Sequence, residues 1–480
     1  MKENLYLRKL AVSIVYAVVF TACLYKAPHG ITFPVFAIAT AAAFFVVLRL
    51  LGETVKKQAY VIVAGITVLA IHVCTTGSPY LILVDKLLIF VLFFVLFLHC
   101  LYDDSKWDVT GYCSAILAFL CSSVSFVGSV ITDAVALRKE KAEAAEVAGE
   151  KQEKEGTARY VVLGLVISIP LLAVIVPLLA SSDAVFANVV SDALKLEIDE
   201  DLLGVAALAV GMFLVSYALI TRCARRMEVL ETPAAEKKRS PVTAITAVTV
   251  ILIVYGIYCG IQVYYLFLGA GRLPEGYTYA TYVHEGFYEL VAVCVINLVM
   301  VLFCQKHSKE HAVLRVLLTI VCACTYVMLG SSLYRMILYI EAYGFTFLRA
   351  FVLWALAVIA LVMAAAVALV HQARFPFVKC SLAALVLTWA VFAYSYPDRW
   401  IAKYNIEKDF DTCYMISELS SDAVPVVVEH WDEIDWKSHK SMGADYEKKF
   451  GEDTAGKDFR NFNFSESRAR EALRKRNQAK

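Results

Sequence analysis

Long apolar runs separated by short polar stretches recur from one end of the chain to the other. A bilayer core needs roughly 20 mostly apolar residues for one helix, and the runs are about that long. Their length and helix-forming residues favour α-helices over the alternating pattern of a membrane barrel. Twelve runs are present, at 10–25, 31–51, 59–76, 81–101, 112–137, 160–180, 202–220, 242–268, 283–304, 313–331, 347–370 and 377–396. The pattern predicts an all-α, polytopic transmembrane helical bundle with about 11 to 12 spans.

The composition agrees with a membrane protein. Hydrophobic residues make up 60% of the 480 residues and charged residues 19%, against about 45 to 50% and roughly 25% in soluble domains. The net charge is +1, and the chain has no nucleic-acid-binding motif. The predicted partner is therefore the lipid bilayer and not a nucleic acid.

Lys and Arg residues in the short loops predict the orientation of the spans, because such loops stay on the cytoplasmic side. From residue 138 onward, the loops assigned to the cytoplasm carry 17 of these residues and the alternating loops carry 4. The 17 are Arg138, Lys139, Lys141, Lys151, Lys154, Arg159, Arg222, Arg225, Arg226, Lys237, Lys238, Arg239, Lys306, Lys309, Arg315, Arg374 and Lys379. The 4 are Lys195, Arg272, Arg335 and Arg349. The count places the segment after residue 396 outside the cytoplasm.

The first half of the chain conflicts with a simple alternation of spans. Arg8, Lys9, Lys56 and Lys57 place the N-terminus in the cytoplasm, yet five spans would then put the basic 138–159 stretch outside. One run must not cross, and 112–137 is the best candidate because its polar residues recur at helical spacing, as in an interfacial helix. They are Ser114, Ser122, Ser125, Ser129 and Asp133. We expect eleven crossings and one helix on the inner surface; the alternative is twelve spans with a different start.

The runs and the charged stretches divide the chain into four parts. Residues 1–137 form N-terminal membrane hairpins with the interfacial helix, and 138–159 form a charged cytoplasmic linker. Residues 160–396 form the main membrane domain, and 397–480 form an extracytoplasmic tail. The tail has too many aromatic residues for a disordered segment, so we expect short helices docked on the outer face.

The stretch 279–298, "YATYVHEGFYELVAVCVINL", introduces ionisable residues into an apolar run. Glu285 and Glu289 are one helical turn apart, and Asn297 continues the polar stripe two turns further on. Polar groups in a spanning helix face the protein interior or water. Glu285 and Glu289 are therefore predicted to form a partly buried charge network with Arg335 or Arg349 at the outer mouth of the bundle.

Further ionisable groups fall on the same predicted outer side. They are Asp183, Arg272, Glu275, His284 and Glu341. Asp85 interrupts the fourth run, and because its side chain is too short to reach the interface, we expect it to face the bundle. His307 and His311 are one turn apart without the spacing of a zinc-protease motif, and nearly all cysteines lie inside apolar runs. No catalytic residue, metal site or cofactor is predicted.

Several separated motifs resemble an uncharacterised bacterial membrane family, the domains of unknown function 4173 and 4153. They are "LLASSDAVFANVV" at 178–190, "LFLGAGRLPEGYTYATYVHEGFYELVAVCVINL" at 266–298, "LYRMILYIEAYGFTFLRAFVLW" at 333–354, "IAKYNIEK" at 401–408, "SDAVP" at 421–425 and "DFRNFNFSESRARE" at 458–471. His284 departs from this resemblance, since Arg is usual before Glu-Gly-Phe. The resemblance implies a multi-pass protein of the bacterial inner membrane and no established activity.

Two classes of function are kept. Outward-facing binding or transport of a small solute or ion fits the number of spans and the inward polar face. A membrane sensor or assembly platform, acting through its extracytoplasmic face and a protein partner at the tail, fits charges that gather toward one surface, because transporters place their sites near the midplane. An enzyme fits least, since no nucleophile elbow or phosphate-binding loop occurs.

Overall fold

The protein is described by a computed structural model, in which nearly all regular structure is helical. The described residues are 2–147 except 106, 200–225, 239–264, 287–434 except 411, 440–451 and 458–479, with isolated positions between 168 and 186. Apart from one isolated β-bridge between Arg239 and Ser308, the regular elements among these residues are helices. The predicted all-α helical bundle is confirmed.

Ten of the described helices are long and apolar enough to cross a membrane. They are α1 (Lys2–Leu24), α2 (Thr32–Leu50), α3 (Lys57–Thr75), α4 (Pro79–Leu101), α9 (Glu200–Ala224), α10 (Pro241–Gln262), α12 (Phe287–His307), α13 (Ala312–Tyr343), α14 (Phe347–His371) and α15 (Phe377–Tyr394). Each of them overlaps one of the predicted runs. The predicted run at 160–180 lies outside the described residues except for isolated positions.

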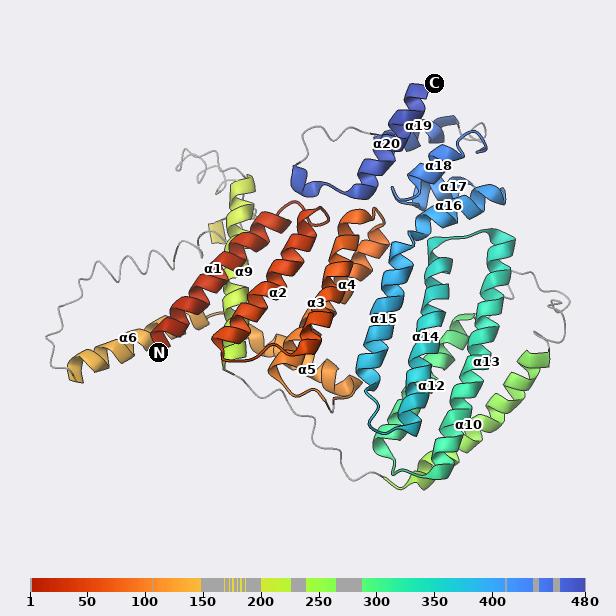
Figure 1. Ribbon diagram of the computed structural model, residues 1–480, viewed down its shortest axis with the longest axis horizontal. Helices are drawn as coiled ribbons and strands as arrows, with labels where there is room; N and C mark the ends of the chain where they lie inside the picture. Colours follow the sequence, from red (N-terminus) through yellow and green to blue (C-terminus); the bar gives the residue numbers. More distant parts are fainter. Residues whose placement is uncertain are drawn as a thin grey trace.

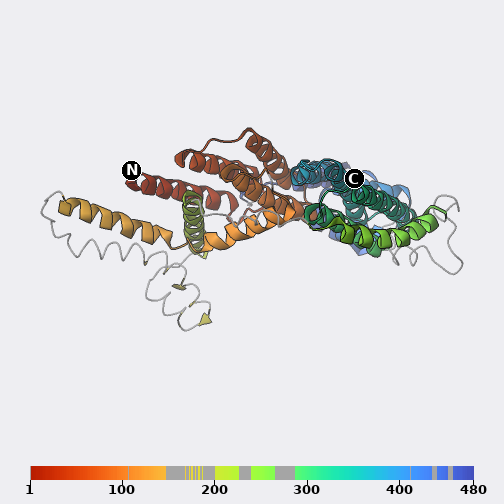
Figure 2. The same ribbon diagram turned by 90° about the horizontal axis from the view of Figure 1, so that it is seen from below.

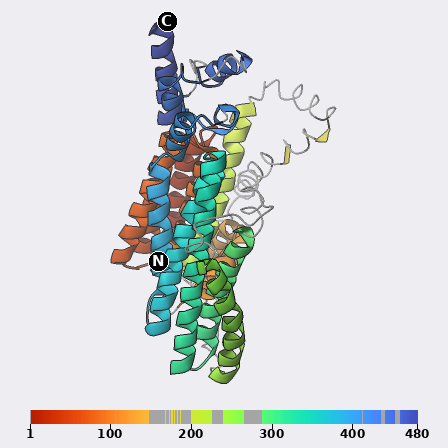
Figure 3. The same ribbon diagram turned by 90° about the vertical axis from the view of Figure 1, so that its right-hand side faces the viewer.

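The spans lie side by side in an elongated band, as Figures 1 and 2 show. The tail covers one end of α3, α4 and α14, and Figure 3 shows it projecting beyond that end. We call this end of the bundle the tail end and the other the opposite end. The start of α1 lies at the opposite end (Figure 1).

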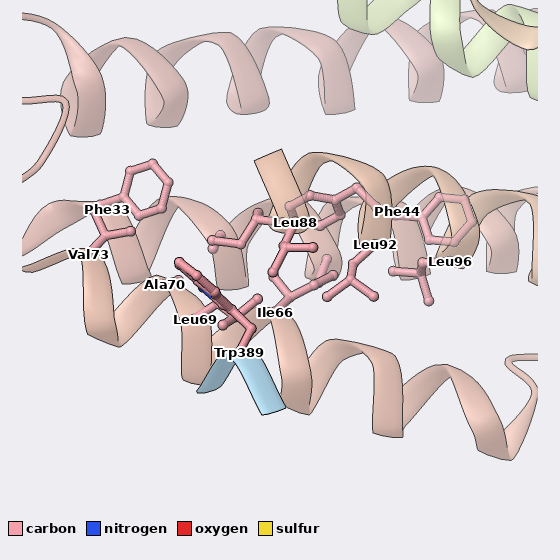
Figure 4. Close-up of a cluster of buried hydrophobic side chains, with 14 of the residues drawn as sticks. Phe33, Phe44, Ile66, Leu69, Ala70, Val73, Leu88, Leu92, Leu96 and Trp389 are labelled. Atoms are coloured by element: carbon pink, nitrogen blue, oxygen red, sulfur yellow. The ribbon is translucent and has the colours of Figure 1, made fainter. Parts of the chain in front are cut away.

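Helix α4 is the centre of the larger apolar core. It begins with Pro79 in its first turn, where the missing N–H of proline costs no helical hydrogen bond. Of its most apolar window, 61% of the residues are buried inside the protein. Figure 4 shows Trp389 of α15 reaching between side chains of α3 and α4, among them Ile66, Leu69 and Leu88. This tryptophan joins the first half of the chain to the second.

Helices α10, α12, α13 and α14 form the other side of the band. Buried residues such as Leu318, Cys322 and Met363 pack between them. Helix α10 lies at the edge, with only 6% of its apolar window buried. Because lipid tails are as apolar as these side chains, such an exposed apolar face is expected for a helix within a bilayer.

Polar contacts hold the two sides together at the opposite end. Asp104 follows α4; its carboxylate lies 2.9 Å from Nδ1 of His99 and accepts a hydrogen bond of 3.1 Å from Nζ of Lys379 on α15. Lys306, at the end of α12, pairs with Asp108 at 2.5 Å. Burial raises the pKa of Asp104, but the hydrogen bonds from Tyr112, His99 and Lys379 outweigh it and hold the pKa below its usual range.

The run 112–137 differs from the single helix that its serine spacing predicts. It forms two helices, α5 (Val109–Val124) and α6 (Ser129–Val147), which bend by 61° at the break between them. Four turn residues interrupt the helical hydrogen bonds there, and Gly128 is one of them. α6 runs across the direction of the spans (Figure 1).

Three contacts tie α5 and α6 to the opposite end. Near the start of α5, Tyr112 bonds to Asp104, and near its end Ser122 accepts a 2.7 Å hydrogen bond from Arg222 of α9. On α6, Asp133 pairs with Lys9 of α1 at 2.5 Å. That this segment does not cross the membrane stays a prediction, and these contacts agree with it.

The tail consists of short helices around a small core of its own. They are α16 (Pro397–Glu407), α17 (Thr412–Glu418), α18 (Val424–Glu429), α19 (Lys440–Gly451), the 3-10 helix η2 (Phe459–Asn461) and α20 (Phe464–Ala479). Ile401, Leu419, Val424, Trp431 and Leu473 are buried together in this core. The core also includes Ala350 of α14, so the tail packs directly on the bundle.

Cysteine labelling tests whether α5 and α6 stay on one side. In a cysteine-free chain, Ser105→Cys before α5 and Lys139→Cys within α6 should react with a membrane-impermeant maleimide from the same side as Lys309→Cys. Labelling of the first two positions from opposite sides would show that the segment crosses.

Candidate functional site

A buried polar cluster lies within the bundle near the tail end. Nδ1 of His72 on α3 is 2.6 Å from Oδ2 of Asp85 on α4, and Nε1 of Trp389 on α15 donates to Oδ1 of Asp85 at 2.8 Å. His72, Asp85 and Trp389 are each 0% exposed. We call these three residues the bundle cluster. The expectation that Asp85 faces the bundle agrees with this geometry.

Each hydrogen-bonding atom of the bundle cluster has a protein partner. The second ring nitrogen of His72 lies 3.1 Å from the carbonyl oxygen of Ala393. Both carboxylate oxygens of Asp85 are occupied, by His72 and Trp389. A buried polar group without a partner is costly in a low-dielectric interior, so this complete pairing stabilises the contact of α3, α4 and α15.

A second polar cluster fastens the tail to the loop between α3 and α4. Oδ2 of Asp422 accepts hydrogen bonds from the hydroxyl of Thr76 and, at 3.2 Å, from the backbone amide of Gly77. The side-chain amide of Asn463 donates to the carbonyl oxygen of Thr76 at 2.9 Å. We call Thr76, Gly77, Asp422 and Asn463 the tail clamp. Thr76, Asp422 and Asn463 are buried, so the clamp is shielded from water.

Gly77 has a steric role in the tail clamp. A Cβ atom at this position would lie 1.9 Å from the hydroxyl oxygen of Ser421. Any larger residue would therefore push the loop away from the tail. Ser421 is in turn hydrogen-bonded to Ser465 of α20 at 2.8 Å.

Asp398 is buried beside the tail clamp. Its Oδ2 accepts hydrogen bonds from the hydroxyl and the amide of Ser420, at 2.5 and 3.2 Å. Burial raises the pKa of Asp398 to about 6, and the charge of Asp422 adds to the rise against the hydrogen bonds from Ser420. The carboxyl group therefore changes its charge close to neutral pH.

A continuous chain of contacts links the bundle cluster to the tail clamp. The ring of His72 lies 5.9 Å from the ring of Tyr396, which has a left-handed φ of 51° at the join of α15 and α16. The guanidinium of Arg399 lies 4.3 Å above the ring of Tyr396, and its Nε donates to the carbonyl of Asp422 at 3.2 Å. Tyr396 and Arg399 thus lie between the bundle cluster and the tail clamp and contact both.

A third polar cluster lies between α10, α12 and α13. Asn297 is fully buried; its side-chain amide donates to Thr325 at 2.9 Å and its Oδ1 accepts from Tyr255 at 2.5 Å. Gln262 accepts a 2.7 Å hydrogen bond from Ser331 one layer closer to the tail end. The expected inward position of Asn297 agrees with the structure, and its partners are neutral rather than charged.

The structure differs from expectation at Glu289. Its side chain is exposed, and no ion pair between described residues joins it to Arg335 or Arg349. The guanidinium of Arg349 instead bonds to the carbonyl oxygens of Tyr343 and Gly344 at the end of α13. These carbonyls have no helical partner, so Arg349 caps the negative end of the helix.

The other predicted residues do not meet in one described site. Arg335 is buried in α13, whereas Glu341 and Asp183 are exposed. Arg272, Glu275, His284 and Glu285 lie outside the described residues. The network of Glu285 and Glu289 with an arginine therefore stays a prediction. In the described part of the chain, no group of three or more His, Cys, Asp or Glu side chains is placed to hold a metal ion.

The tail also carries an open groove between α16, α18 and α20. Its volume is about 460 Å³, which is within the range of small-molecule sites. Its lining includes Arg399, Arg468 and Lys475 together with the acids Glu429 and Glu471. Pro425 and Val426 form an apolar part of the wall. We call this feature the tail groove; it offers both signs of charge beside an apolar surface.

The chain matches a known family over residues 61–430, a domain of unknown function, DUF4153. The chain belongs to the DUF4153 family. The match includes the bundle cluster and Asp422 of the tail clamp, whereas Asn463 and η2–α20 follow it. The resemblance to the family 4173 is not confirmed, whereas the resemblance to 4153 is. No curated protein and no solved structure matches this DUF4153 protein.

Sequence reasoning missed most members of these clusters. His72 and Trp389 lie in apolar runs, and the polar residues at helical spacing from His72 are the two threonines at the end of its own run, so nothing in the sequence pointed to a contact between segments so far apart along the chain. Asp398 and Asp422 lie in the tail, where charged residues are common. The motif "SDAVP", which contains Asp422, was the one available signal.

Replacing Asp85 tests the bundle cluster. Asp85→Ala leaves the buried donors of His72 and Trp389 without an acceptor, at about 1 to 3 kcal/mol for each. We expect the free energy of unfolding in detergent to fall by about 2 to 6 kcal/mol. The double variant with His72→Ala should lose less than the sum of the single losses, as interacting neighbours do. The control is Asp103→Ala, which removes an exposed acid after the same helix and should leave the free energy of unfolding unchanged. Strictly additive losses for Asp85→Ala and His72→Ala would contradict the proposed pairing.

The buried Asp398 predicts how the stability of the folded tail depends on pH. An aspartate in the unfolded tail has a pKa near 3.9, and that of the buried residue is about 6, so the folded tail binds the proton more tightly. Its stabilising contribution is complete below about pH 4, is lost as the pH rises through about 6, and amounts to about 3 kcal/mol. Hydrogen exchange at the amides of 397–434, corrected for intrinsic rates, should show this loss. Asp398→Asn should remove it; an unchanged pH profile in that variant would assign the effect to another group.

Proposed function

We propose that this protein is a membrane-anchored binding platform whose tail carries the recognition surface. The membrane bundle holds the tail in place, and the tail groove receives a small ligand or a segment of a partner protein. This corresponds to the sensor or assembly class rather than to a transporter.

The tail clamp is the observation that carries the proposal. A tail without a binding role could rest on the bundle through apolar contacts alone, because its own core is apolar and includes Ala350 of α14. Here Asp422, Thr76 and Asn463 are buried and hydrogen-bonded to one another's backbone or side chains. Rigid elements position a binding surface better than loops do, and Arg399 connects the tail clamp to the wall of the tail groove.

The polar groups inside the bundle support an anchoring role. Asp85 is paired with His72 and Trp389, and Asn297 with Thr325 and Tyr255. Groups that are already hydrogen-bonded to one another are less available to a passing solute. They stabilise the contacts between helices. A hydrogen bond between transmembrane helices contributes about 1 to 2 kcal/mol in model peptides.

Proton-linked transport is the second candidate, and one observation favours it. An ionisable pair inside a spanning helix bundle, such as His72 and Asp85, is typical of proton relays. The outer loop 265–286, which contains predicted site residues, lies outside the described residues. The two candidates differ in which residues they need: the platform needs the tail groove, and the transporter needs Asp85.

The proposed orientation places the N-terminus in the cytoplasm and the tail outside, in a bacterial inner membrane. The excess of Lys and Arg in alternate loops supports it. It puts the tail groove in the extracytoplasmic space, where a platform meets its ligand or partner.

Site-specific photo-cross-linking in cells tests the platform. A benzoylphenylalanine residue in place of Ala472, within the tail groove, should give a discrete adduct. The same residue in place of Lys403, exposed on α16, is the control and should give none. Asp422→Ala releases the tail clamp and should remove the adduct at position 472, because the groove loses its fixed position.

Proton flux separates the two candidates. Proteoliposomes containing a pH-sensitive dye should show the same flux for the unaltered protein and for Asp85→Asn if the protein is a platform. A flux that Asp85→Asn abolishes, together with equal cross-linking at positions 472 and 403, would favour transport and contradict the platform.

A further inference from the structure

A small hollow lies at the opposite end, away from the tail. It is formed by the loop between α12 and α13 and by the end of α14, at the lower end of these helices in Figure 1. Its volume is about 100 Å³, against about 30 Å³ for one water molecule, so a phosphate group fits. We call this feature the loop hollow.

The loop hollow is lined by more basic than acidic side chains. Lys309, Arg315, His311 and His371 line it, and Glu310 is the single acid among its lining residues. Among the described residues, no ion pair involves the side chain of Lys309 or Arg315, and none involves Glu310. Two full positive charges and one negative charge therefore line the hollow, which leaves a net positive charge.

The walls of the loop hollow are fixed by hydrogen bonds between the helices. Nε2 of His371 on α14 lies 3.2 Å from the hydroxyl oxygen of Thr319 on α13. The side-chain amide of Gln305 on α12 donates to the carbonyl oxygen of Leu369 at 3.2 Å. Leu314 and Val370, both 3% exposed, form the apolar floor. A site whose walls are already ordered loses less entropy when a ligand binds.

An apolar strip begins at the start of α13, two residues after His311 of the loop hollow. Val313, Val316 and Ile320 follow one another at helical spacing and are 49%, 58% and 43% exposed. The strip lies on a candidate membrane span, and the loop hollow lies where the spans α12, α13 and α14 end. A molecule with a phosphate group and hydrocarbon chains would place the phosphate in the hollow and the chains along the strip.

We propose that the loop hollow is a binding site for the phosphate group of an anionic phospholipid. Arg315 donates hydrogen bonds to the phosphate oxygens, as a planar guanidinium does well, and Lys309 adds a second charge. The acyl chains lie on Val313, Val316 and Ile320. Free phosphate shares the headgroup chemistry, but it makes no use of the strip, so the strip favours a lipid as the source. The inference does not depend on the proposed platform.

Lipid binding to the full-length protein in detergent tests the site. The probes are dioleoyl phosphatidylglycerol, dioleoyl phosphatidylcholine, glycerol 1-phosphate and inorganic phosphate, with affinities measured by native mass spectrometry. Phosphatidylglycerol should bind most tightly. Each Lys or Arg near a lipid surface contributes on the order of a fivefold change in affinity, so Lys309→Gln with Arg315→Gln should weaken its binding about 30-fold.

Matched variants make the outcome decisive. Lys57→Gln removes an exposed cation at the same end of the bundle, at the start of α3, and should leave binding unchanged. Arg315→Lys keeps the charge and should retain most of the affinity. If the double variant does not fold, Lys309→Gln alone should weaken binding about fivefold.

Three results would overturn the proposal. Unchanged phosphatidylglycerol affinity in the folded Lys309→Gln and double variants would show that the loop hollow does not bind the lipid. Equal affinity of the unaltered protein for phosphatidylcholine and phosphatidylglycerol would show that the net charge of the lipid has no role. Glycerol 1-phosphate or inorganic phosphate binding as tightly as phosphatidylglycerol would assign the loop hollow to a soluble anion instead of a lipid.

Discussion

Pairing of buried polar groups between helices is the constraint on which this structure depends. Asp85 lies on α4, the most buried of the spans, where neither water nor lipid can satisfy a carboxyl group. It therefore requires partners from other helices, and it has them in His72 and Trp389. Because Trp389 comes from α15, the same requirement that satisfies Asp85 joins the two sides of the band and orders the core around Ile66, Leu69 and Leu88.

The same constraint governs the tail. Its helices are too short to be stable alone, and they are ordered by a common core that includes Ala350 of α14 and by buried bonds to the α3–α4 loop. Asp422 and Asn463 form hydrogen bonds with backbone and side-chain groups of Thr76 and Gly77. Without the tail, these groups at the end of the α3–α4 hairpin would lack those partners. His72, Tyr396 and Arg399 connect these bonds to the bundle cluster, so the tail and the bundle form one mechanical unit.

These features bear on the class of function. A transporter needs polar groups that are available to a solute and that exchange partners during the cycle. In the described part of the chain, the buried groups of the bundle cluster and those around Asn297 are bonded to one another, and the tail groove and the loop hollow lie at the two ends. The tail groove presents both signs of charge on a fixed support, and the loop hollow presents a net positive charge at the limit of the apolar helices. Binding at the two ends thus agrees better with the distribution of charged residues than passage through the middle does.

The sequence alone was sufficient for the class of the protein, because length and hydrophobicity decide which segments cross a bilayer. Its predicted apolar runs include all ten candidate spans of the described residues. The cost of a polar group facing lipid predicted the inward positions of Asp85 and Asn297. The sequence did not predict the partners of those groups, since His72, Trp389 and Asp422 carry no local pattern that links them to Asp85 or Thr76. It also missed the 61° bend that breaks the run 112–137. Glu289 is exposed, and its network with Glu285 stays a prediction. Hydrophobicity is a property of each segment, whereas pairing depends on which helices become neighbours, and only the tertiary structure decides that.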